Sequence, residues 1–461
     1  MNITNSQESE DAQFVQSQLP SNGLFEGHDW RIAIRPFTIS QDLLDELQSL
    51  GRVLLQFNRA ANLLYRLSVA GKQPGWVSRW LDLGKPEELL AFQRHSSFKN
   101  DVPRVIRPDI LLTENGFVIT ELDSVPGGIG LTAWLNDTYS RLPLHGPGSP
   151  ANTSTYQVVG GPSGMKEGFR NLFGAAPRVH IVISEESSTY RPEMEWLASQ
   201  LGEDRFKVRD SSYNEFGQDD AVYRFFELYD APAIANARGI FERARDREIL
   251  LTPPPKPLFE EKMLFALLWN RNLRGFWRQE LGEGFLNRLQ KRVPYSWIID
   301  PQPMPPHAAI PVLNITDWQQ LKSMSQKERE LIIKISGFSP DAWGSRGVVL
   351  GSDLSSADWA QAVDRAIDGA ESSPFILQQF HKTGLVQVPW WDPVSGNPQS
   401  LQGRARLCPY YFVQGDADNA RASLGGILAT VCPANKKIIH GMRDAVLAPC
   451  AVGLPPHGSS L

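Results

Sequence analysis

Apolar residues recur at helical spacing in an early stretch of the chain. From Ser40 onward they fall at Leu43, Leu44, Leu47, Leu50, Leu54, Phe57 and Leu64, which is the period of one face of a helix. Ser40 is a residue type that favours the N-cap position. The pattern predicts one or two packed helices up to about Ala70.

The period changes to two in residues 104–123. Two alternating runs, Arg104–Thr113 and Phe117–Asp123, flank Glu114-Asn115-Gly116, and this arrangement is a strong hairpin signal. The hairpin is followed by a loop over Ser124–Gly130 and then by polar sequence to about Gly174, for which we expect only connecting structure.

The register of this hairpin decides where its charged residues lie. A two-residue Asn115-Gly116 turn would pair Asp109 with Leu122. A three-residue loop with Gly116 left-handed would instead pair Asp109 with Glu121 and Arg107 with Asp123. Only the three-residue register gathers the apolar residues on one face, so it is the predicted one.

Further along, short apolar runs alternate with helical patterns. Residues 178–252 are typical of an α/β unit, with strands at Val179–Ser184, Phe206–Val208, Ala221–Tyr223 and Glu248–Leu251 and a helix at Arg191–Leu201. After Pro253-Pro254-Pro255 the pattern predicts helices at Lys262–Trp277 and Asp358–Ile367, and strands at Leu331–Ile335, Val348–Leu350, Phe375–Phe380, Leu385–Pro389, Arg404–Val413 and Ser423–Val431.

Composition sets limits on the class of protein. A chain of 461 residues, 41% hydrophobic and 21% charged, is an ordinary globular protein of about three domains. The net charge of −5 argues against binding of nucleic acid. There is no run of apolar residues long enough to span a membrane and no secretory signal. Cys408, Cys432 and Cys450 are expected to be free thiols in a cytoplasmic protein.

The charged face of the hairpin is the first candidate site. Asp109, Glu121 and Asp123 would repel one another unless a cation lay between them, and oxygen ligands suit magnesium. Arg107 would neutralise part of this charge or bind a phosphate. The alternative is a solvated polar face of an edge hairpin.

A second candidate combines a lysine with a glycine-rich loop. Lys334 lies in the apolar strand Leu331–Ile335, and interior lysines are rare unless they are paired or face a ligand. The loop Gly337–Gly347 that follows could approach phosphate oxygens through its backbone, and Arg346 adds a planar fork of donors. The alternative is an ordinary loop beside an edge lysine.

Other candidates carry a weaker signal. Lys262 follows Glu260-Glu261 at the start of a helix, where most lysines merely pair with neighbours. Gln378 and Gln379 end a buried strand, where backbone groups could contact a purine. A substrate carboxylate could be held by Arg404, Arg406 and Arg421, although exposed arginines at such positions usually contribute to solubility or form surface ion pairs.

Taken together, these motifs resemble the circularly permuted ATP-grasp superfamily, in particular glutathionylspermidine-synthase-like ligases. The resemblance rests on Arg107-Pro108-Asp109, Glu121-Leu122-Asp123 and Pro126-Gly127-Gly128, and extends to Glu261-Lys262, Lys334 with its loop, and Gln378-Gln379. The lysine and glycine loop follow the acidic motif here, whereas they precede it in ordinary ATP-grasp chains. Asp123 stands where the family usually has Asn, which adds a charge.

The resemblance implies an α/β (α+β) fold, a circularly permuted ATP-grasp with a Rossmann-like pre-ATP-grasp subdomain. Together with the polar N-terminal and Pro/Gly-rich C-terminal composition, it predicts a disordered tail at 1–25, helices and the metal hairpin at 26–175, the Rossmann-like subdomain at 176–256, nucleotide-binding subdomains at 257–445 and a second tail at 446–461.

The resemblance also implies roles for individual residues, with ATP and Mg²⁺ as cofactors. The implied magnesium ligands are Asp109, Glu121 and Asp123, and the catalytic arginines are Arg107 and Arg346. The nucleotide would contact Lys262, Lys334, Gly337, Gly344, Ser345, Gly347, Gln378 and Gln379.

The expected activity is an ATP-dependent ligation of a small carboxylate to an amine, without the amidase domain of bifunctional relatives. The alternatives are a small-molecule kinase and a non-catalytic nucleotide-binding scaffold. A nicotinamide enzyme is disfavoured because no GxGxxG follows Val179–Ser184. Chains of this size often form symmetric dimers, and the sequence leaves the oligomeric state open.

Overall fold

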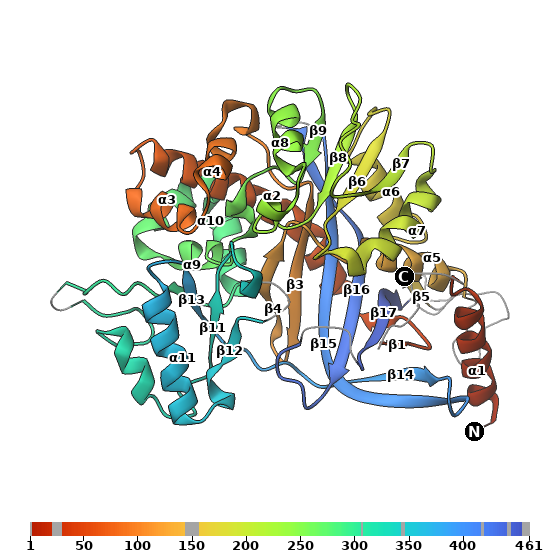
Figure 1. Cartoon of the computed structure of the whole chain (residues 1–461). Helices are drawn as coiled ribbons and strands as arrows, with labels where there is room; N and C mark the ends of the chain where they lie inside the picture. The colour runs from red at the N-terminus through yellow and green to blue at the C-terminus, as the bar shows by residue number, and fades with distance from the viewer. Residues whose placement is uncertain are drawn as a thin grey trace.

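The computed structural model describes residues 2–20, 30–142, 156–305, 308–342, 346–415, 419–439 and 444–453, with side chains from residue 8 onward. Within these ranges a long mixed sheet occupies the centre of the molecule (Figure 1), with strand order β1-β17-β16-β15-β3-β4 and with β14, β2 and β5 attached. Its nine described strands are β1 (Arg31–Ile32), β2 (Phe37–Ile39), β3 (Val105–Thr113), β4 (Gly116–Asp123), β5 (Tyr156–Val158), β14 (Val386–Asp392), β15 (Asn397–Gln414), β16 (Arg421–Pro433) and β17 (Val446–Gly453).

Both faces of the central sheet are covered, and strand alternation divides the core between them. On β15, Leu407 and Tyr411 belong to the core that also contains helix α2 (Gln41–Val69). Cys408 and Tyr410 belong to a second core, which contains α5 (Ile129–Ser140), α6 (Gly164–Asn171) and α7 (Arg191–Leu201). Burial on both faces explains why the second half of β15 and the second half of β16 read as nearly continuous apolar runs.

Helix α2 confirms the first prediction from the sequence. Ser40 caps it, its side chain accepting a hydrogen bond from the backbone N–H of Leu43. The other helices on this side of the molecule are α3 (Gly75–Asp82), α4 (Glu87–Arg94), α9 (Leu264–Trp269) and α10 (Arg274–Arg292). The single helix predicted for Lys262–Trp277 is wrong, because Asn270 has extended backbone and separates α9 from the following turn and α10.

A parallel sheet of order β7-β6-β8-β9 forms a second unit of the described chain. All four predicted strands and α7 are present, so the α/β unit expected for residues 178–252 is confirmed. The fold of this unit is completed by α8 (Ala237–Arg245), and its strands are β6 (Val179–Ile183), β7 (Phe206–Asp210), β8 (Ala221–Phe225) and β9 (Leu250–Thr252).

A small antiparallel sheet of order β10-β13-β11-β12 forms the third unit, covered by α11 (Ser356–Gly369). It contains the lysine strand predicted from the sequence, and its described strands are β10 (Ser296–Ile298), β11 (Leu331–Ile335), β12 (Val348–Leu350) and β13 (Phe375–Gln379).

Three expectations about irregular segments are wrong. The N-terminal tail contains helix α1 (Asn2–Ser17), where Val15 is fully buried against the second core. The tail at 446–461 begins with strand β17, which pairs with β16; residues 454–461 lie outside the described chain. The connecting segment contains α5 and α6. Helix α5 is buried almost all round, so it shows no amphipathic pattern in the sequence.

Candidate functional site

The hairpin β3–β4 places its charged residues in the predicted register, but by a different route. Arg107 pairs with Asp123 and Asp109 with Glu121, as expected. The tip, however, pairs Thr113 with Gly116, which leaves a two-residue turn at Glu114-Asn115. The register then shifts between Asp109 and Ile110, where β4 carries Thr120 as an extra residue. A β-bulge, not a three-residue loop, therefore aligns the acids.

The hairpin faces a cavity of about 200 Å³ that several units of the fold enclose. Loops after β6 and β8 supply one wall, at the carboxyl ends of parallel strands, where ligands of open α/β sheets usually bind. The glycine-rich loop and the segment before α9 supply the rest. Side chains that line it include Arg107, Asp109, Glu121, Asp123, Ser187, Tyr190, Glu227, Tyr229, Glu260 and Lys262, and the backbone at Gly337 also contributes.

Arg107 lies between two of the hairpin carboxylates. Its Nε is 3.2 Å from Oδ1 of Asp109 and one terminal nitrogen is 2.8 Å from Oδ2 of Asp123. The other terminal nitrogen donates to the carbonyl of Gly127 at 3.1 Å. Asp109 has a second cation, since Arg406 on β15 lies 3.1 Å from its Oδ2. The predicted surface role of Arg406 is therefore wrong, because its side chain is 11% exposed.

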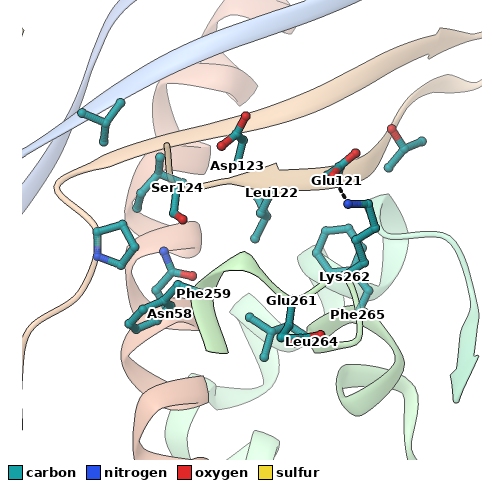
Figure 2. Close-up of a pocket in the computed structure, with 14 residues that line it drawn as sticks. Asn58, Glu121, Leu122, Asp123, Ser124, Phe259, Glu261, Lys262, Leu264 and Phe265 are labelled. Atoms are coloured by element: carbon teal, nitrogen blue, oxygen red, sulfur yellow. Dashed lines mark ion pairs between the residues drawn. The ribbon is translucent and has the colours of Figure 1, made fainter. Parts of the chain in front are cut away.

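Lys262 joins the hairpin to the glycine-rich loop. Its Nζ is 2.7 Å from Oε1 of Glu121, the ion pair drawn in Figure 2, and it also donates to the carbonyl of Ala342 at 2.7 Å. Figure 2 further shows Glu121 and Asp123 on one side of β4 and Leu122 on the other. Burial opposes ionisation of Glu121, but Lys262 and Lys334 outweigh it and lower the pKa of this carboxyl.

Two further carboxyl groups, of Glu227 and Glu260, line the cavity opposite the hairpin. Burial raises the pKa of Glu227 well above its ordinary value, and the nearby carboxyls of Glu260 and Asp123 raise it further. The pKa of Asp123 is also raised, by burial and by Glu121 and Asp109, against the opposing effect of Arg107. Glu260 is balanced by Arg224, 2.7 Å away. Carboxyl groups from the hairpin and from the segments after β8 and before α9 therefore face one another across the cavity.

The three hairpin carboxylates line one cavity, but they do not form a ready-made metal site. Among the described residues, no three histidine, cysteine or acidic side chains are grouped closely enough to hold a metal ion. Each carboxylate is instead held by an arginine or lysine. The assignment of Asp109, Glu121 and Asp123 as magnesium ligands stays a prediction.

Lys334 and the glutamines lie behind the hairpin and do not line the cavity. The Nζ of Lys334 donates to the carbonyl of Thr120 at 3.1 Å and to Oε1 of Gln378 at 2.9 Å. Burial lowers the pKa of Lys334 to about 8. Gln378 also donates to Ser296, so both the oxygen and the nitrogen of its side-chain amide have a partner. Gln379 is exposed, and its backbone N–H donates to Tyr295.

The glycine-rich loop is described at both ends. Gly337 has φ of +60° and lines the cavity, and the backbone N–H of Gly347 donates to the carbonyl of Asp341 at 2.8 Å. Arg346 is not among the residues that line the cavity; it lies 3.2 Å from Glu186, in the loop after β6. The predicted contacts of Gly344 and Ser345 lie outside the described residues.

Several site residues were missed at the sequence level. Glu227 and Tyr229 follow β8, and the rule that sites form at the carboxyl ends of parallel strands could have identified them. Glu193 on α7 does not line the cavity, but it holds the segment after the hairpin, and no sequence signal marks it. Its two oxygens accept from the backbone N–H groups of Gly128 and Leu131 at the start of α5. Burial outweighs these bonds and raises its pKa to about 7.

The three cysteines are free, as predicted, and all three are buried. No helix in the described chain is long and apolar enough to cross a membrane.

No family model matches this chain, and no curated protein matches it. Solved structures do. A glutathione synthetase-like effector from Globodera pallida, in its apo form, aligns with a TM-score of 0.55 and 10% sequence identity, covering 98% of this chain and 97% of that one. A protein assigned as γ-glutamylcysteine synthetase from Methylobacillus flagellatus KT aligns with a TM-score of 0.41 and 11% identity, covering 85% and 87%. The first alignment shows the mixed α/β fold of circularly permuted, glutathione synthetase-like ATP-grasp structures.

Proposed function

Proceeding from this fold, we propose that the chain is an ATP- and magnesium-dependent ligase that joins a carboxylate to an amine. The observation that carries the proposal is the cavity in which Arg107, Lys262 and the hairpin carboxylates meet beside the glycine-rich loop. Clustered cations beside a glycine-rich backbone suit phosphate groups, and a neighbouring carboxylate set suits the metal that accompanies them.

The residues of the cavity fit magnesium in their chemistry. Five carboxyl groups line it, from Asp109, Glu121, Asp123, Glu227 and Glu260, and oxygen is the ligand that magnesium prefers. Burial, and after it repulsion from neighbouring carboxyls, raises the pKa values of Asp123 and Glu227, and a divalent cation would relieve the repulsion. When bound by the hairpin acids, magnesium would neutralise charge on the phosphates of ATP.

The reaction requires two displacements. A carboxylate oxygen of the acid substrate attacks the γ-phosphorus of ATP, and ADP leaves as an acyl phosphate forms. The amine nitrogen then attacks the acyl carbon, phosphate leaves and the nitrogen loses a proton, giving an amide. Arg107 and Lys262 would stabilise charge on the phosphoryl group in transfer. The glycine-rich loop, tied by Lys262 and Arg346, would keep water from the acyl phosphate.

Calorimetric titration with a nonhydrolysable ATP analogue, with and without magnesium, tests the first part of the proposal. Magnesium-dependent binding is expected, followed by release of ADP and free phosphate with a suitable acid and amine. A phosphorylated product without free phosphate would identify a kinase instead. Absence of binding under both conditions would reject the enzyme and favour a non-catalytic scaffold.

A further inference from the structure

A fully buried ion pair lies next to the cavity and has no part in the site described above. The Nζ of Lys85 is 2.5 Å from Oε1 of Glu261, and both side chains are 0% exposed. Lys85 belongs to the turn between α3 and α4, far in sequence from the segment that precedes α9. This pair connects the N-terminal helices with the wall of the cavity.

Glu261 also holds the beginning of the glycine-rich loop. Its Oε2 accepts a hydrogen bond from the hydroxyl of Ser336, and that hydroxyl accepts one from the backbone N–H of Met263 at 2.9 Å. A Cβ atom on Gly337 would lie only 1.9 Å from Oε1 of Glu261. The carboxylate of Glu261 therefore packs directly against the first glycine of the loop.

The next residue in the chain contacts the other parts of the site. Lys262 binds Glu121 on the hairpin and the carbonyl of Ala342 within the loop. Because Glu261 and Lys262 are adjacent, a change in the position of Glu261 moves Lys262 as well. The dipeptide Glu261-Lys262 thus contacts the glycine-rich loop at two points and also binds Glu121 on the hairpin.

Stability alone gives a weak reason for such a pair. Removing two charges from water usually costs as much as their attraction returns, and apolar residues often serve equally well. The turn that carries Lys85 also touches the small-sheet unit, because a Cβ atom on Gly84 would lie 2.7 Å from the carbonyl oxygen of Ser372. The turn therefore contacts both the segment before α9 and the small-sheet unit, which belong to the nucleotide-binding region predicted from the sequence.

We propose that Lys85 is a positioning residue that holds the carboxylate of Glu261 in place, and through it sets the glycine-rich loop and Lys262 for nucleotide binding. The part concerning nucleotide rests on the proposed function. The part concerning the loop does not depend on it, because it follows from the contacts of Glu261 alone.

Hydrogen exchange and analogue binding together test this role. Lys85→Met should accelerate amide exchange in peptides covering residues 336–342 and weaken binding of the ATP analogue about tenfold. The matched control is Lys256→Met. Lys256 is equally buried but bonds Asn62 and the carbonyls of Lys99 and Asp101, so its loss should lower the melting temperature without either effect.

Two further variants separate positioning from simple destabilisation. Adding Glu261→Gln to Lys85→Met should restore slow exchange, because a neutral amide oxygen can still accept from Ser336 without a cation. Ser336→Ala leaves the ion pair intact and should loosen residues 336–342 as Lys85→Met does. If Lys85→Met does not fold, Ser336→Ala and the double variant Lys85→Met/Glu261→Gln still test whether this cluster positions the loop.

The outcomes distinguish this inference from the proposed function. Unchanged exchange at residues 336–342 in both Lys85→Met and Ser336→Ala would overturn the positioning role. Failure of the wild-type protein to bind the analogue would reject the proposed function, while faster exchange in the variants would still establish control of the loop by Lys85.

Discussion

The side chain of Lys334 donates a hydrogen bond of 3.1 Å to the backbone carbonyl of Thr120, the extra residue of the bulge in β4. An extra residue in a bulge is left out of the regular ladder, so its carbonyl is open to a partner outside the sheet. The same bulge brings Glu121 opposite Asp109. One irregularity therefore both aligns the acids and attaches the small sheet to them.

Replacing Lys334 tests whether this attachment serves nucleotide binding. Lys334→Met keeps the length of the side chain and removes its bonds to Thr120 and Gln378. We expect binding of the ATP analogue, measured by calorimetry, to weaken at least about tenfold. Lys327→Met, at an exposed position, should bind as the wild type does. Equal affinity in both variants would exclude Lys334 from the nucleotide site.

Glu121→Gln tests the hairpin acid while keeping its shape. The change removes the charge that pairs with Lys262 and that would bind magnesium, so ATP turnover should fall by about a hundredfold or more. Circular dichroism should show an unchanged fold. Glu114→Gln, at the exposed tip of the same hairpin, is the control. Turnover that survives in Glu121→Gln would contradict both the metal and the charge roles of this residue.

Lys256 should make folding stability depend on pH. Burial lowers its pKa to about 7, below the unfolded value of about 10.4. Between these values the unfolded chain binds more protons, so this group makes stability rise with pH, by at most about 1.4 kcal/mol per pH unit. Below about pH 7 the group is protonated in both states and its contribution is flat.

Urea unfolding at pH 7.5–9.5 checks this prediction. Lys334, with its pKa also lowered by burial, contributes a rise of the same sign, so the useful quantity is the difference between wild type and Lys256→Met. The variant should show a shallower rise. Parallel curves for the two proteins would mean that Lys256 stays charged when buried.

Arg346→Gln tests the contact between the loop and the parallel-sheet unit. The pair with Glu186 is substantially exposed, at 52% and 37%, so the melting temperature should change little. If the contact closes the loop over the cavity, hydrolysis of ATP without amide formation should increase. Arg238→Gln breaks a comparably exposed pair with Glu242 on α8 and should leave the ratio of ADP to amide unchanged. An unchanged ratio of ADP to amide in Arg346→Gln would show that Arg346 does not help to close the loop over the cavity.

Local sequence patterns predicted much of the fold because apolar residues recur in most helices and strands with the single period typical of that element. Helix α2 has a cap and an apolar face, and the strands of the parallel sheet are short apolar runs between turn residues. The errors arose where burial hides the period or where few residues carry it. Helix α5 is buried almost all round, and α1 is anchored by single residues such as Val15 in an otherwise polar segment.

The sequence predicted the residues of the candidate site that lie in recognisable motifs, but not the partners that other units of the fold bring to them. Alternation placed Arg107, Asp109, Glu121 and Asp123 together, although the bulge at Thr120 could not be foreseen. Their partners come from other units, and sequence spacing does not report such contacts. Arg406 looked like a surface residue, yet pairing of β15 with β3 brings it to Asp109.

That pairing has a consequence for how the protein folds. The hairpin β3–β4 is local and can form early, but Asp109 and Cys408 on β15 are 299 positions apart. Closing so long a loop costs entropy before any contact compensates for it, and folds dominated by distant contacts form slowly. Until β15 docks, the hairpin is an exposed β-structure in which Arg107 alone offsets the charge of Asp109, Glu121 and Asp123. Repulsion between these acids would oppose aggregation of the hairpin during that interval, so the charges of the candidate site also protect the folding chain.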